Sequence, residues 1–342
     1  MARPAAALLR APVAEPAPRT SLSPQPQIAC PACQVSESHR VLESFYTYNL
    51  RECSGCRLQF WEPRKMPDAR WYSAMYGERN ARMLPLEPGH RFFLADNLAP
   101  RSGRLLDVGC GTGNFLLAAA QAGYSASGVE LDPAAAAFAR RHCRCGQIFA
   151  VPLESFRVQH PNQIFDVVTF FEVLEHQADP NAFLVEIACL RPRGFIALSV
   201  PNRERWQTSL DALDYPPNHF LRWNSISLQT ALKRHGFTVL SIKKEKPTVA
   251  YTAQQINNKW RTGVSRSLAP GLPHWFRDEI QEDPEQKGKR NGVPPSLRTR
   301  AVQMLGRMKH AACFPVALAT IPYVRWNRFV GPYLYCLARR LD

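Results

Sequence analysis

Residues 104–114 read Arg-Leu-Leu-Asp-Val-Gly-Cys-Gly-Thr-Gly-Asn, and this stretch decides the fold of the chain. Its apolar start, Leu105 to Val108, has the length and composition of one buried parallel strand. The glycines that follow predict a tight turn in which bare backbone lets a ligand approach closely. The run from Phe115 to Gln121 is rich in Leu and Ala and predicts a helix. A strand, a glycine turn and a helix in this order are typical of the first unit of a nucleotide-binding α/β fold.

The alternation of strand and helix patterns continues along the chain. We expect further strands at 124–129, 147–151, 165–170, 195–200, 237–244 and 333–340, and further helices at 134–142, 180–190 and 226–235. Pro133 can occupy the first turn of its helix, and Gly236 can end the last one. Such alternation implies a parallel sheet with helices on both faces.

The composition allows a large core with a basic surface. The chain has 342 residues, enough for two domains or for one domain with large additions. Hydrophobic residues make up 45% of them, so a sizeable core is available. The net charge of +15 is compatible with a nucleic acid, an anionic membrane surface, an anionic substrate or a basic face in contact with solvent alone. No apolar run reaches the roughly 18 residues of a transmembrane helix. The start of the chain is a poor signal peptide, and the cysteine usage favours a reducing cytoplasm.

Four of the ten cysteines form two close pairs near the start of the chain. The pairs, Cys30 with Cys33 and Cys53 with Cys56, have the spacing C-x2-C-x19-C-x2-C. Each pair can place two thiolates on one tight turn, and two such turns complete a tetrahedron around zinc. The intervening residues 41–50 are suited to a hairpin. The pattern predicts a structural zinc ribbon, and a set of reduced, unliganded thiols is the alternative.

We divide the chain into a disordered tail (1–27), the ribbon (28–62), a helical connector (63–100), the α/β core (101–250), a lid or substrate insertion (251–330) and a final core strand (331–342). The Trp/Tyr cluster at 71–76 is expected to pack the ribbon against the core. The apolar stretch 311–324 contains Pro315 and Pro322. We expect it to pack against the core, with weak contact to a membrane surface as the alternative.

A carboxylate follows the second strand at a position that matters for cofactor binding. Glu130 lies 21 residues after Gly109, at the end of the strand 124–129. A carboxylate there can accept hydrogen bonds from both hydroxyls of a ribose. This feature alone fits either NAD or S-adenosylmethionine.

The full set of motifs resembles the class I S-adenosylmethionine-dependent methyltransferases. The segments that carry the resemblance are LLDVGCGTGNF, GVELDP, FDVVTFFEVLEH and IALSVPN, within residues 103–244. The chain is most similar to a bacterial subgroup with an N-terminal CxxC…CxxC ribbon. The resemblance implies a Rossmann-like seven-stranded sheet whose last strand is antiparallel, with a long insertion before that strand. Arg193 stands where the family usually has glycine, and Glu154 is the nearest candidate for the acidic residue that often contacts adenine.

The same resemblance implies roles for individual residues. The residues expected to bind S-adenosylmethionine are Asp107, Gly109, Cys110, Gly111, Gly113, Glu130, Leu131, Phe170 and Phe171. Asp107 and the glycine turn would wrap the methionine part and the ribose, and Glu130 would hold the ribose hydroxyls. Phe170 and Phe171 would lie beside the cofactor, or would serve only to pack the core.

A cluster of acidic and histidine residues follows the fourth strand. Glu172, Glu175 and His176 are spaced to share one helical turn, and His219 follows the fifth strand. The E-x-x-E-H pattern with a later histidine resembles two groups of O-methyltransferases, in which such residues bind a divalent cation that gathers adjacent hydroxyls. Three roles stay open: a second metal site, a general base at His219 without metal, or packing alone.

The motifs favour an S-adenosylmethionine-dependent methyltransferase that methylates an oxygen of a small-molecule or sugar- or lipid-linked acceptor. The alternative is an RNA-modifying methyltransferase that holds RNA with the ribbon and the basic surface. Against it, the basic residues lie mainly in the tail and the insertion rather than among aromatic residues of the ribbon. A dehydrogenase and a non-catalytic binding protein are two further alternatives.

Overall fold

The computed structural model describes residues 27–68, 71, 75, 82–143, 146–206, 210–264 and 297–341. Residues 1–26 of the expected tail, most of the Trp/Tyr cluster at 71–76 and residues 265–296 of the expected insertion lie outside the described residues.

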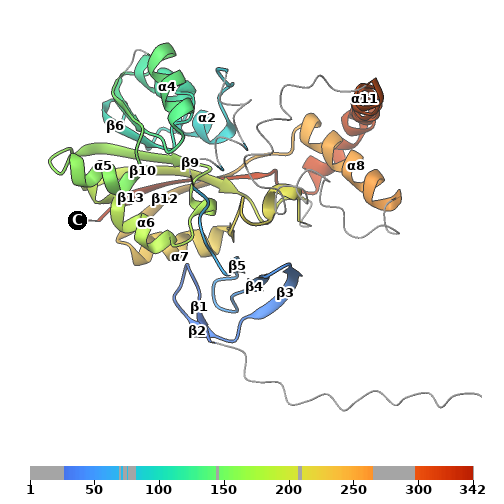
Figure 1. The fold of residues 1–342 in the computed structure, drawn as a ribbon, viewed down its shortest axis with the longest axis horizontal. Coiled ribbons are helices and arrows are strands. Elements are labelled where there is room, and N and C mark those ends of the chain that lie inside the picture. The colour runs from blue at the N-terminus through green and yellow to red at the C-terminus, as the bar shows by residue number, and fades with distance from the viewer. Residues whose placement is uncertain are drawn as a thin grey trace, which may run out of the picture.

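A seven-stranded sheet forms the centre of the molecule (Figure 1), with the strand order β12-β13-β10-β9-β6-β7-β8. The strands are β6 (Gly103–Val108), β7 (Tyr124–Val129), β8 (Ile148–Phe149), β9 (Phe165–Phe171), β10 (Leu190–Pro201), β12 (Phe237–Lys244) and β13 (Tyr333–Arg340). β13 pairs antiparallel with both β10 and β12, and the other neighbouring pairs are parallel. The seven-stranded sheet with an antiparallel last strand is therefore confirmed.

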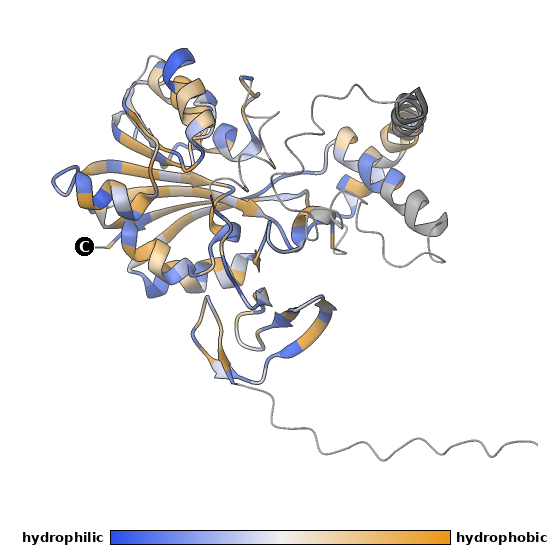
Figure 2. Ribbon diagram, viewed as in Figure 1, coloured by the Kyte–Doolittle hydropathy of each residue, from blue (hydrophilic) through white to orange (hydrophobic). Residues whose placement is uncertain are grey.

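Helices cover both faces of this sheet (Figure 1). One face packs against α5 (Leu153–Gln159), α6 (Pro180–Glu186) and α7 (Ser225–Arg234), and the other against α2 (Pro88–Leu94), α3 (Asn114–Gln121) and α4 (Pro133–His142). Apolar residues are concentrated on the central strands and on the inner sides of these helices (Figure 2). Because both faces are covered, β9 is buried along nearly its whole length.

The N-terminal segment folds into two small sheets that join the core. β1 (Ile28–Ala29) pairs with β2 (Ser36–Glu37), and β3 (Arg40–Phe45), β4 (Tyr48–Glu52) and β5 (Gln59–Glu62) form an antiparallel sheet. The β3–β4 hairpin confirms the one expected over residues 41–50. β5 also pairs with β11 (Leu221–Arg222), which lies far away in the sequence. The ribbon therefore shares a sheet with the core instead of standing apart from it.

The described part of the insertion is a pair of helices, α8 (Val249–Val264) and α11 (Leu297–Trp326). Cys313 and Ala317 of α11 are buried against Ala253 of α8, and Pro315 and Pro322 lie within α11. The stretch 311–324 thus packs on the insertion's own first helix, and the expectation that it packs on the core was wrong. The small residues at the contact allow the two helices to approach closely. Among the described residues, no helix is long and apolar enough to cross a membrane.

Candidate functional site

The glycine turn and Glu130 form one hydrogen-bonded unit at the carboxyl edge of the sheet. Gly111 donates its backbone N–H to Glu130 Oε2 at 2.8 Å, and Asp132 donates its own to Glu130 Oε1 at 2.8 Å. Gly111 has a φ of 53° and no atom within 4 Å of the position where a Cβ would stand. The turn therefore presents bare backbone to open space, as a closely bound ligand requires. Burial raises the pKa of Glu130, and the two N–H donors act against that rise.

Asp107 is a second carboxylate beneath the turn. It is 3% exposed and accepts a hydrogen bond from Thr169 Oγ1 at 2.7 Å. Burial raises the pKa of Asp107 to about 7, against the lowering effect of the Thr169 hydroxyl. The turn thus lies close to a buried carboxylate, Asp107, and a partly buried one, Glu130, and the two favour a cationic or hydroxyl-bearing ligand.

A cavity of about 500 Å³ extends from this turn to the Glu/His cluster. It is lined by most of the residues expected from the sequence: Asp107, Gly109, Cys110, Gly111, Glu130, Leu131, Phe171, Glu172, Glu175, His176 and His219. Glu154, the candidate adenine contact, also lines it, beside Pro152 and Leu153 after β8. Most of the expected cofactor residues and all four expected acceptor residues therefore share one cavity.

Two expected cofactor residues do not line this cavity. Phe170 is fully buried and packs edge-on against Phe183 on the α6 side of the sheet, because alternate residues of a strand point to opposite faces. Gly113 faces α4, where an added Cβ would lie 3.2 Å from Ala139 Cβ. Glycine at 113 therefore permits close helix packing, and Phe170 takes the core-packing role that the sequence analysis left open beside the cofactor role.

Glu175, His176 and His219 converge in the other half of the cavity. His176 Nε2 lies 3.6 Å and His219 Nε2 lies 3.9 Å from Glu175 Oε1. A ligand atom from each of the three residues lies within 4.8 Å of the others. Both carboxylate oxygens of Glu175 are buried and without a hydrogen-bond partner among the described residues. Burying a carboxylate without hydrogen-bond partners costs free energy, so the site favours binding of a cation or protonation of Glu175.

The two imidazoles are held in the form that binds a metal or accepts a proton. Burial lowers the pKa of His176 to about 4 and lowers that of His219 well below its usual value. His176 Nδ1 lies 2.5 Å from the carbonyl oxygen of Asn218, so Nδ1 carries the hydrogen and Nε2 keeps its lone pair. Burial and the nearby Glu172 charge raise the pKa of Glu175 well above its usual value.

Glu172 occupies a different position from the other three. Its Oε1 accepts a hydrogen bond from Ser199 Oγ at 2.7 Å, and its backbone has a φ of 54°. It lines the cavity at the end of β9 but is not part of the three-residue cluster. A 3-10 turn, Leu174–His176, takes the place of the expected α-helical turn and separates Glu172 from Glu175.

The sequence did not single out two further walls of the cavity. One comes from the connector and includes Met66, Leu84, Glu87 and His90. The other comes from the loop after β10 and includes Arg205, Asp211, Leu213, Asp214 and Asn218. The aspartates could have been noticed from their closeness to His219 in the sequence, but the connector residues carry no motif. Both walls depend on contacts between distant segments.

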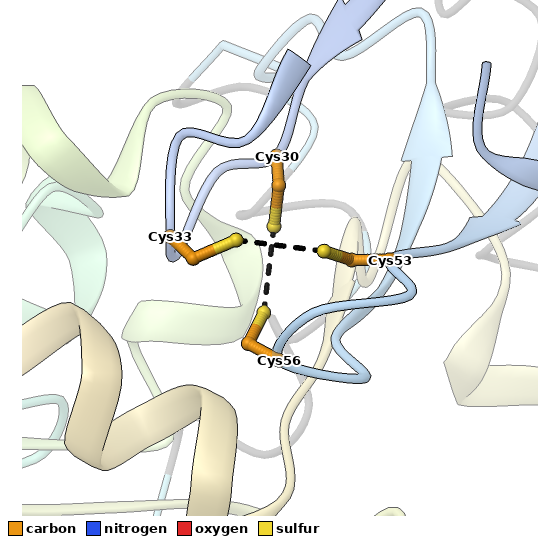
Figure 3. Close-up of side chains that lie close together, drawn as sticks. All are labelled: Cys30, Cys33, Cys53 and Cys56. Carbon is orange, nitrogen blue, oxygen red and sulfur yellow. Dashed lines mark hydrogen bonds between the residues drawn. The ribbon is translucent and has the colours of Figure 1, made fainter. Parts of the chain in front are cut away.

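The four paired cysteines converge as the spacing predicts (Figure 3). Their sulfur atoms lie within 4.8 Å of one another, and Cys30–Cys56 and Cys33–Cys53 are each 3.5 Å apart. A zinc ion with four thiolates requires sulfur atoms about 3.8 Å apart. The hydrogen bond from Cys56 lowers the pKa of Cys30 to about 5, so the cluster already favours one thiolate. The cluster can therefore hold a tetrahedral metal ion.

Comparison with known proteins agrees with this geometry. Residues 77–242 match the family model described as a methyltransferase domain. The ubiquinone biosynthesis O-methyltransferase of Bordetella avium is 39% identical over 115 residues, which are 32% of this chain and 46% of the relative. The enzyme of the same name from Saccharophagus degradans is 33% identical over 140 residues, which are 40% of this chain and 58% of the relative. The chain spans about half the length of the curated relatives it matches.

Solved structures resemble the chain more distantly. An S-adenosylmethionine-dependent methyltransferase from Mesorhizobium loti covers 74% of this chain and 96% of its own, with 16% identity and a TM-score of 0.43. The strand order and the glycine turn of the chain itself are those of the methyltransferase fold.

Proposed function

Residues 77–242 are a class I S-adenosylmethionine-dependent methyltransferase domain, and from that premise we propose that the chain methylates an oxygen of a small-molecule acceptor. The acceptor class we favour is an aromatic compound with two adjacent hydroxyls. The matched relatives are named for ubiquinone biosynthesis, which supports a small molecule over RNA. The observation that carries the proposal is the buried Glu175 carboxylate with two neutral imidazoles beside it, in the same cavity as the glycine turn.

In this proposal the cofactor occupies the half of the cavity near the glycine turn. Glu130 would accept hydrogen bonds from the ribose hydroxyls while its two backbone donors hold it in place. Gly109, Cys110 and Gly111 would lie along the cofactor, and Phe171 would border its reactive end. Methyl transfer is an in-line displacement, so the enzyme's main contribution is to align the acceptor oxygen with the sulfonium methyl.

The Glu175 cluster would prepare the acceptor oxygen. Glu175, His176 and His219 form a set of two imidazoles and one carboxylate that suits a divalent cation. Such a cation lowers the pKa of a bound hydroxyl and fixes its orientation. Without it, His219 would accept the hydroxyl proton directly, since its lowered pKa keeps the imidazole neutral. We favour the cation because Glu175 Oε1, which has no hydrogen-bond partner among the described residues, lies within 4 Å of Nε2 of both imidazoles.

We also propose that the four cysteines of the ribbon hold zinc. With four thiolates the ion has no open position, so its contribution is to folding rather than to chemistry. Metal analysis of the purified chain by inductively coupled plasma mass spectrometry should return one zinc per chain, and none after Cys33→Ser with Cys56→Ser.

The test of the proposed activity is His219→Ala beside His142→Ala, a histidine on α4 that does not line the cavity. Both proteins are assayed with S-adenosylmethionine and 3,4-dihydroxybenzoate, with and without Mg²⁺, and S-adenosylhomocysteine binding is measured by calorimetry. His219→Ala should lose at least about a hundredfold in methyl transfer and bind S-adenosylhomocysteine normally. Full methyl transfer by His219→Ala would contradict the assigned site. Sensitivity of the native protein to chelation separates the cation from the general base.

A further inference from the structure

We propose that the ribbon, residues 28–62, positions the acceptor wall of the cavity, which we define as residues 211–219, and leaves the cofactor half independent. A fully ligated cysteine cluster has no chemistry of its own, so its effect on the enzyme must pass through contacts. Several of those contacts run to the segment that carries His219. The inference depends on the fold alone and not on the identity of the acceptor.

The backbone connection comes first. Trp61 donates its backbone N–H to the carbonyl oxygen of Phe220 at 2.9 Å, and Leu221 pairs with Phe60 where β5 and β11 run side by side. His219 therefore lies two residues before β11, a strand that belongs to the ribbon's own sheet. A shift of β5 would displace the backbone that carries the histidine.

Side chains from the ribbon fix the start of the same wall. Trp61 Nε1 donates to the carbonyl oxygen of Asp214 at 2.9 Å, and the Tyr215 hydroxyl donates to Glu43 at 2.7 Å. The rings of Phe45 and Trp61 lie against Tyr215, with centroids 4.9 and 5.5 Å away. Asp214 lines the cavity while Tyr215 faces the ribbon, so the ribbon supports the wall on the side away from the cavity.

The wall in turn holds the reactive cluster. The carbonyl oxygen of Asn218 orients His176 through Nδ1, and Phe220 donates its N–H to the carbonyl oxygen of Glu175 at 2.9 Å. Thus two hydrogen bonds connect the residues on either side of His219 with the turn that bears Glu175 and His176. The Trp61, Phe220 and Glu175 backbones form one continuous series of hydrogen bonds from ribbon to cluster.

The metal-binding turns themselves touch the core on both sides. Asn181 donates Nδ2 to the carbonyl oxygen of Pro31, inside the first cysteine pair, at 2.9 Å. Asn224 donates Nδ2 to the carbonyl oxygen of Arg57, directly after the second pair, at 3.0 Å. Opening the cysteine cluster would release both anchors. The cofactor half is held differently, by Glu130 and the short-range turn at 109–113.

Hydrogen–deuterium exchange of the full chain tests this connection. The variants are Cys33→Ser, which removes one thiolate, and Tyr215→Phe, which removes one hydroxyl that bonds the ribbon. The matched control is Tyr48→Phe, a ribbon tyrosine whose hydroxyl makes no hydrogen bond to the described residues. Tyr215→Phe should raise the exchange rate of amides 211–224 about fivefold, the effect of one hydrogen bond. Cys33→Ser should raise it at least about tenfold, and Tyr48→Phe should not change it.

At the glycine turn, in contrast, we expect no change in amide exchange or in cofactor affinity. Exchange at 105–114 and affinity for S-adenosylhomocysteine should match the native protein in Tyr215→Phe and Tyr48→Phe. The proposal is overturned if exchange in both test variants rises only within 28–62. It is also overturned if Tyr215→Phe weakens S-adenosylhomocysteine binding as much as it loosens 211–224. These readouts contain no acceptor, so they remain valid even where 3,4-dihydroxybenzoate is not methylated.

Discussion

The two halves of the cavity are built in different ways. The half that we propose for the cofactor consists of a turn and a carboxylate about twenty residues apart, joined by the hydrogen bond from Gly111 to Glu130. The acceptor half joins the end of β9, the loop after β10, the connector and the ribbon. The first half depends on local sequence, and the second depends on tertiary contacts. A cofactor site built locally can stay constant while distant segments reshape the acceptor site.

The largest expected effect falls on the acceptor half. Glu175→Gln keeps the size of the side chain but removes the charge that a cation would need, and we expect methyl transfer to fall about a thousandfold. S-adenosylhomocysteine affinity should be unchanged by calorimetry. Glu186→Gln, on α6 and away from the cavity, is the control. Equal losses in affinity and in rate would show that the halves are not separate.

The corresponding change in the cofactor half is Glu130→Gln. It replaces the charged acceptor of two backbone N–H groups with an amide, so S-adenosylhomocysteine should bind about 10- to 100-fold more weakly. Calorimetric titration measures this, with Glu186→Gln again as the control. An unchanged affinity would remove Glu130 from the cofactor site.

A pH dependence should distinguish Asp107 within the same half. Because burial raises its pKa to about 7, acidification below that value protonates the carboxyl and removes its attraction for the cofactor's amino group. S-adenosylhomocysteine affinity should therefore fall about tenfold between pH 8 and pH 6. In Asp107→Asn this fall should disappear. A fall of the same size in the variant would assign the titration to another group.

The smallest expected effect separates Phe170 from Phe171. Phe170→Leu removes volume from a closed core and should lower the free energy of unfolding by about 1–1.5 kcal/mol, with cofactor affinity unaffected. Phe171→Leu alters a side chain that lines the cavity and should weaken cofactor binding. Urea denaturation and calorimetry measure the two quantities. Weaker cofactor binding by Phe170→Leu, with normal binding by Phe171→Leu, would instead place Phe170 at the cofactor site.

The sequence predicted the strands and the glycine turn around the proposed cofactor half because their signals are local. The strand β7 has the bounds that its pattern indicated, and the glycine turn and Glu130, which follow neighbouring strands, are joined by a hydrogen bond. Phe170 and Phe171 show the limit, since neighbouring aromatic residues on a buried strand give no sign of which one faces a ligand. The two rings point to opposite faces of β9, and only the tertiary structure shows that the face of Phe171 borders the cavity.

The acceptor half was predicted only in part. The E-x-x-E-H pattern located Glu175, His176 and His219, but it placed Glu172 with them, whereas a 3-10 turn and Ser199 direct that carboxylate elsewhere. The pairing of β5 with β11 joins residues about 160 positions apart, so no local sequence pattern could predict it. Met66 and His90 reach the cavity through packing alone.

The most direct test of the account uses S-adenosylmethionine carrying a CD₃ group and 3,4-dihydroxybenzoate as the acceptor. Mass spectrometry and NMR of the product identify which atom receives the label. We predict transfer to a single hydroxyl oxygen, and its loss in Glu175→Gln while S-adenosylhomocysteine still binds. Transfer to a ring carbon or to the carboxylate, or undiminished transfer in Glu175→Gln, would contradict the proposed site.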